Sequence, residues 1–121
     1  MSRRILVVED QEDNRQILRD LLANAGYEMI EAGDGEQAIK AANEHRPDLI
    51  LMDIQLPELD GYEATRRIKA NPALNSTPVI VVTSYALSGD EEKARAAGAD
   101  GYVAKPYSPR ALLAKIREYV P

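Results

Sequence analysis

The sequence predicts an α/β fold in which five helices cover a doubly wound, five-stranded parallel sheet. Most of the strand candidates are unbroken apolar runs, as are strands that a parallel sheet buries on both faces. Stretches with helical spacing of apolar residues alternate with them, which is typical of right-handed crossovers in one sheet. The 121 residues suit a single domain, which we expect to span residues 1–121 around one core.

Five strands are expected. The strongest is the run Leu-Ile-Leu-Met at 49–52, which leads directly into Asp53. Two other runs are equally apolar, and two are weaker. The five candidates are residues 5–8, 27–32, 49–52, 79–82 and 101–104.

Five helices occupy the intervals between and after these strands. With their caps, they are expected at residues 12–25, 34–45, 62–70, 88–98 and 108–119. Gly26 and Pro47 are expected to end the first two, and the Asp60-Gly61 turn is expected to begin the third. In the first helix, the apolar residues Ile17, Leu18, Leu21, Leu22 and Ala25 follow helical spacing.

The composition excludes several kinds of site and partner. The chain has no Cys, so it has no disulfide, thiol nucleophile or cysteine-ligated zinc site, and a single His45 rules out sites that need two histidines. A formal net charge of −5 argues against general nucleic-acid binding. Because no apolar stretch suits a signal peptide or a membrane span, we expect a cytosolic protein with no membrane contact.

Polar side chains follow four of the five predicted strands, at the carboxyl ends where open α/β sheets bind ligands. They are Glu9-Asp10, Asp53, Thr83-Ser84 and Lys105. If these strands are neighbours, three carboxylates meet and repel one another, and a divalent cation such as Mg²⁺ relieves that repulsion. A carboxylate nucleophile, Mg²⁺, a lysine and a hydroxyl are the groups that phosphoryl transfer uses.

With these residues identified, the chain resembles the receiver domain of the two-component response regulators. Four motifs carry the resemblance along the whole chain: Val-Val-Glu-Asp at 7–10, Leu-Met-Asp-Ile-Gln-Leu-Pro-Glu-Leu-Asp-Gly at 51–61, Val-Thr-Ser at 82–84, and Tyr-Val-Ala-Lys-Pro at 102–106. The chain is most similar to single-domain regulators of cell-cycle or motility relays. The resemblance implies a flavodoxin-like sheet with strand order 2-1-3-4-5.

The resemblance implies a phosphoacceptor and a metal site. Asp53 matches the residue that receives the phosphoryl group, and Glu9 and Asp10 match the acidic pair that holds Mg²⁺. Asp53 and the backbone carbonyl of Gln55 are expected to complete the protein ligands.

It also implies a conformational switch. Lys105 matches the lysine that binds the phosphoryl group, and a cis bond to Pro106 is expected to aim it inward. Thr83 matches the switch hydroxyl, and Tyr102 matches the aromatic residue whose rotamer changes on activation.

Two residues at the pocket rim are interpreted from their chemistry. Gln55 lies two positions after Asp53, and Tyr85 two positions after Thr83, so both are expected to flank the phosphoryl group. A bulky Tyr85 would hinder in-line water, which predicts slow autodephosphorylation. An unchanged decay rate in Tyr85→Ala would contradict this hypothesis.

The resemblance implies protein partners on two surfaces. The phosphodonor is expected to be a sensor histidine kinase or a histidine phosphotransfer protein. The residues of this chain that select this partner are expected to be Asn14, Ile17, Leu18 and Tyr107-Ser108. The downstream target is expected on the face formed by the helix at 88–98, the strand at 101–104 and the helix at 108–119. Such a module is not an enzyme beyond catalysing its own phosphorylation and dephosphorylation.

Two other functions and one other origin remain open at this stage. A Mg²⁺-dependent phosphohydrolase needs an acid two residues after its nucleophile, where this chain has Gln55. A flavin-binding electron carrier needs a loop that accepts phosphate, whereas residues 9–13 are mostly acidic. The chain could also be a receiver from a hybrid kinase, although the initiating Met1 and the compact end at Pro121 favour a free-standing regulator.

Overall fold

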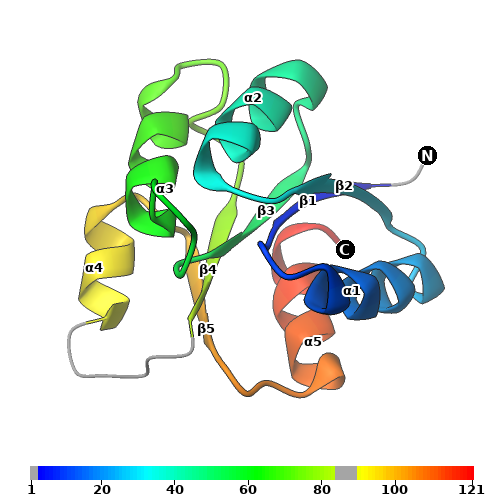
Figure 1. Cartoon of the computed structure of the whole chain (residues 1–121). Helices are drawn as coiled ribbons and strands as arrows, with labels where there is room; N and C mark the ends of the chain where they lie inside the picture. Colours follow the sequence, from blue (N-terminus) through cyan, green and yellow to red (C-terminus); the bar gives the residue numbers. More distant parts are fainter. Residues whose placement is uncertain (1–2, 84–89) are drawn as a thin grey trace.

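The computed structural model describes residues 3–83 and 90–121, which form one parallel sheet with helices on both sides (Figure 1). Its strands are β1 Arg4–Val8, β2 Glu28–Ala32, β3 Leu49–Asp53, β4 Val79–Thr83 and β5 Gly101–Ala104. Their order is β2-β1-β3-β4-β5, and every neighbouring pair is parallel. The predicted fold class and strand order are therefore confirmed.

The helices are distributed over the two faces of the sheet. They are α1 Glu12–Asn24, α2 Gly35–His45, α3 Gly61–Ala70, α4 Asp90–Ala96 and α5 Pro109–Tyr119. Figure 1 shows α1 and α5 on one side of the sheet, and α2, α3 and α4 on the other. Two buried apolar clusters, one per face, fill the space between the sheet and these helices.

The central strand β3 contributes to both clusters. Leu49 and Leu51 point toward α1 and α5, whereas Ile50 and Met52 point toward α2, α3 and α4. All four side chains are buried, because successive residues of a strand face opposite sides. The first polar residue of β3 is Asp53, at the carboxyl edge of the sheet.

Side-chain caps fix where the helices begin. Asp34 accepts a hydrogen bond from the backbone N–H of Gln37 at the start of α2, and Asp60 accepts one from Glu63 at the start of α3. The predicted Asp60-Gly61 turn before α3 is thus confirmed. For α4, the sequence offers Ser88 or Asp90 as the cap. Neither is tested, because Ser88 lies outside the described residues and the side chain of Asp90 is not described.

The apolar residues of α1 differ in how far they are buried. Leu18 and Leu22 are buried, whereas Ile17 is 61% exposed and is the one large apolar residue exposed within 3–83 and 90–121. Ile17 lies four residues before Leu21, so it is at the edge of the apolar stripe rather than at its centre. It is also one of the residues expected at the partner surface.

Within 3–83 and 90–121, the structure contains no helix with both the length and the apolar character that a bilayer span requires.

Candidate functional site

Three carboxylates gather at the carboxyl ends of β1 and β3. One oxygen from each of Glu9, Asp10 and Asp53 lies within 4.8 Å of the other two. The register pairs Val8 of β1 with Met52 of β3, so the residues that follow them emerge side by side. The predicted convergence of the three carboxylates is therefore confirmed. They lie between β1 and β3, where the strand order of the doubly wound sheet reverses.

Lys105 lies among these carboxylates. Its Nζ is 3.2 Å from Asp53 Oδ2 and 3.5 Å from Glu9 Oε1. Burial disfavours the ammonium, but the two carboxylates outweigh this effect and raise the pKa of Lys105 above its usual value. The expected cis bond between Lys105 and Pro106 is present.

Backbone and amide groups hold the buried carboxylates in place. Glu9 accepts hydrogen bonds from Asn14 Nδ2 at 3.0 Å and from the N–H of Gln11 at 3.3 Å. Asp53 Oδ1 accepts one from the N–H of Gln55 at 3.0 Å, which leaves Oδ2 toward Lys105. Asp53 is therefore oriented from both sides.

The predicted switch residues lie on the adjacent strands. Thr83 is buried at the end of β4, and its backbone carbonyl accepts a hydrogen bond from the N–H of Lys105 at 2.7 Å. Tyr102 is half-buried on β5, opposite Val81 in the register, and it packs against the cluster beneath α2, α3 and α4. Because Thr83 follows Val81 by two residues, Thr83 and Tyr102 belong to the same face of the sheet. Tyr85, the predicted rim residue, lies outside the described residues, so its effect stays a prediction.

Tyr107 is a site residue that the sequence reasoning placed only at a partner surface. It lines a small cavity of about 20 Å³ beneath the site, together with Glu9, Asp53 and Lys105. Burial raises the pKa of the Tyr107 phenol, which also lies in the fields of Lys105, Glu9 and Asp53. One signal in the sequence could have indicated this place. Tyr107 lies two residues after Lys105, just as the predicted rim residue Gln55 lies two residues after Asp53.

The donor set fits Mg²⁺. Three carboxylates with one lysine leave a net negative site, and the carboxylates open onto a cleft of about 340 Å³. Gln55 lines the same cleft. All-oxygen ligands beside space for water are what Mg²⁺ requires, since it retains several waters in proteins.

The family model of the response regulator receiver domain matches residues 5–117. The chain belongs to this family. Among its relatives, the polar-differentiation response regulator DivK of Brucella anthropi is 45% identical over 120 residues, covering 99% of this chain and 98% of that protein. DivK of Brucella ovis is 44% identical over the same shares.

Solved receiver structures superpose on the whole fold. The chemotaxis response regulator CheY4 of Vibrio cholerae has a TM-score of 0.93 at 28% identity, covering 99% of this chain and all of that one. The receiver domain of the sensor histidine kinase PA1611 of Pseudomonas aeruginosa has a TM-score of 0.91 at 39% identity, covering 98% of each chain. That structure has a magnesium ion coordinated in its active site cleft.

Membership of the family defines the class of function. A receiver domain is a phosphoacceptor module of two-component signalling rather than an enzyme, and its partner is a histidine kinase. The cluster of Glu9, Asp10 and Asp53 matches the magnesium site of receiver domains.

Proposed function

We propose that Asp53 accepts a phosphoryl group from the phosphohistidine of a sensor histidine kinase or a histidine phosphotransfer protein. A carboxylate oxygen of Asp53 attacks phosphorus, the P–N bond of the donor breaks, and its electron pair returns to the imidazole nitrogen. The observation that carries this proposal is the environment of Asp53. It is a buried carboxylate with one oxygen fixed by a backbone N–H and the other 3.2 Å from a lysine ammonium.

Glu9, Asp10 and Asp53 would hold Mg²⁺, together with the backbone carbonyl of Gln55. When bound, the ion neutralises these carboxylates and stabilises charge on the oxygens of the transferred group. Lys105 serves the same group from the other side. Its raised pKa keeps it cationic, so its ammonium can bind a phosphoryl oxygen after Asp53 is modified.

The output is a shift between two arrangements of the sheet edge. Phosphorylation replaces one carboxylate charge with a group of about −1.5 to −2 and three acceptor oxygens, to which the Thr83 hydroxyl can donate. Tyr102 then turns toward the position that Thr83 vacates. The shared face of Thr83 and Tyr102 supports a readout on the surface of α4, β5 and α5, where we place the downstream protein target.

The domain assignment and the location belong to the same proposal. We assign residues 1–121 to one receiver domain, which the family match over residues 5–117 supports. We place its action in the cytosol, where histidine kinases obtain their phosphoryl group from ATP.

Labelling with a small phosphodonor tests the chemistry. Acetyl phosphate with Mg²⁺ should add one phosphoryl group, measured by intact mass, and chelator should abolish the addition. Asp53→Asn should not be labelled, whereas Asp20→Asn on the exposed side of α1 should behave like the wild type. Equal labelling of the wild type and Asp53→Asn would refute the proposal.

A further inference from the structure

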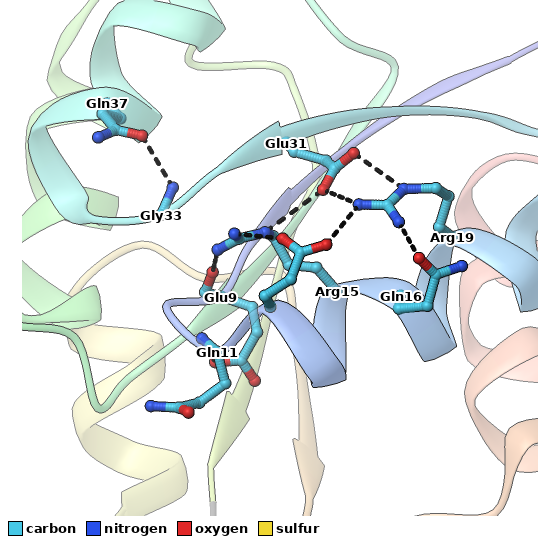
Figure 2. Close-up of polar contacts among 9 residues, drawn as sticks. Glu9, Gln11, Arg15, Gln16, Arg19, Glu31, Gly33 and Gln37 are labelled. Carbon is cyan, nitrogen blue, oxygen red and sulfur yellow. Dashed lines mark hydrogen bonds and ion pairs between the residues drawn. The ribbon is translucent and has the colours of Figure 1, made fainter.

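Arg15 of α1 connects the segment that follows β1 with β2, next to the acidic site. Its guanidinium donates from Nη1 to the backbone carbonyl of Glu9 at 2.6 Å. It also pairs through Nη2 with Glu12 at 2.6 Å. Its Nε lies 3.3 Å from the carboxylate of Glu31 of β2 (Figure 2). The side chain is only 18% exposed, so Arg15 is an integral part of this corner of the fold rather than a solvated surface charge.

The Glu9 carbonyl belongs to the peptide that joins the two acidic residues of the pair. On the other side of Glu9, its N–H donates to the carbonyl of Ala32 at 3.0 Å, which continues the ladder to β2. The strand β1 ends at Val8, so the ladder does not fix the peptide between Glu9 and Asp10. Arg15 supplies that restraint, while the adjacent Asn14 holds the Glu9 carboxylate.

We propose that Arg15 is a positioning residue for the metal-binding carboxylates. By binding the Glu9 carbonyl, it holds the Glu9–Asp10 peptide in the orientation that turns both side chains toward Asp53. The inference rests on the proposed function, because it concerns how this chain prepares its Mg²⁺ ligands.

Charge and geometry predict opposite effects of removing Arg15. A positive group near a cation site repels the cation, so electrostatics alone predicts tighter Mg²⁺ binding when Arg15 is lost. Geometry predicts weaker binding, because the acidic pair is then free to move apart under its own repulsion. We expect the geometric effect to dominate, because the guanidinium also interacts with Glu12 and Glu31, which offset its charge.

Arg19 is the matched control. It lies one turn further along α1 and pairs with the same two carboxylates, Glu12 and Glu31. Its remaining hydrogen bond is to Gln16, and Figure 2 shows it on the side of Glu31 away from Glu9. Arg19→Met therefore removes the same charge and the same kind of ion pairs without touching the acidic pair.

The experiment is a calorimetric titration of the full chain with Mg²⁺ alone, beside thermal unfolding without metal. Loss of groups that orient metal ligands typically weakens binding by about 10–100-fold. We expect about 10-fold weaker binding in Arg15→Met, since Asn14 and Gln11 still hold the Glu9 carboxylate. Arg19→Met should stay within about twofold of the wild type.

A second variant keeps the test decisive if Arg15→Met does not fold. Arg15→Lys retains the charge, but its single ammonium lacks the fork that reaches Glu9 and Glu31 together, so weaker Mg²⁺ binding is again expected. The inference fails if either Arg15 variant binds Mg²⁺ as tightly as the wild type, or if its loss of Mg²⁺ affinity equals that of Arg19→Met. Either outcome leaves the proposed function intact. A wild type that does not bind Mg²⁺ overturns the proposed function and this inference with it.

Discussion

Replacing Gly61 by Ala tests how closely α3 is packed against the backbone of the proposed phosphoacceptor. A Cβ at Gly61 would lie 2.2 Å from the carbonyl oxygen of Asp53 and 2.8 Å from Cα of Ile54. Both atoms belong to the backbone, so no side-chain rotation relieves the contact. Either α3 or the end of β3 must move by roughly 1 Å, in a core that resists such shifts.

The expected loss of stability follows from two opposing terms. Overpacking that displaces backbone typically costs about 1–3 kcal/mol, and a clash with two backbone atoms belongs at the upper end. The better helix propensity of Ala returns less than about 1 kcal/mol, because Gly61 is the first residue of α3. The net loss should be about 2 kcal/mol, or about 8 °C in Tm for a chain of this size.

Urea unfolding and the rate of labelling by acetyl phosphate measure the two consequences. Gly33→Ala is the matched control, because a Cβ there meets Arg15 and Gln37 side-chain atoms at 3.5 and 3.6 Å, an ordinary contact. Gly33→Ala should change stability by less than about 0.5 kcal/mol. If Gly61→Ala were as stable as Gly33→Ala and were labelled at the wild-type rate, the packing argument would be refuted.

Three further predictions concern charge, buried hydrogen bonds and metal. Because the folded pKa of Lys105 is raised, its stabilising effect is complete below its unfolded pKa of about 10.4 and is lost as pH rises through the folded value. Metal-free wild type should thus lose stability more steeply above that pH than Lys105→Met, and parallel profiles would contradict the assignment. Tyr27→Phe removes a buried hydrogen bond of 2.7 Å to a backbone carbonyl and should cost about 1–1.5 kcal/mol in urea unfolding. Tyr119→Phe removes an exposed bond of the same length and should cost clearly less, so equal losses would count against the burial argument. Mg²⁺ at a hundred times its Kd should stabilise the wild type by about 2.7 kcal/mol, and a similar gain in Asp10→Asn would show that the ion binds elsewhere.

The sequence predicted the sheet and the acidic cluster because both depend on local pattern. The run at 49–52 is apolar without interruption because both faces of β3 are covered, and its first polar residue is at the ligand-binding edge. Asp60 likewise indicated the start of α3, because it caps this helix by accepting a hydrogen bond from a residue only three positions away. Such signals need no knowledge of distant contacts.

The features that sequence reasoning missed depend on how elements meet. The contact of Arg15 with Glu31 requires α1 to lie against β2 in a particular register, which no periodicity encodes. Tyr107 reaches the cavity below Asp53 because of the path that the chain takes after Lys105.

The most direct test of the account is the chemical identity of residue 53 after treatment with a phosphodonor. Borohydride reduces an aspartyl phosphate to homoserine, which peptide mass spectrometry locates. The account predicts homoserine at position 53 in samples treated with acetyl phosphate and Mg²⁺, and unmodified Asp53 when chelator is present. Homoserine at another carboxylate, or at position 53 regardless of chelator, would contradict it.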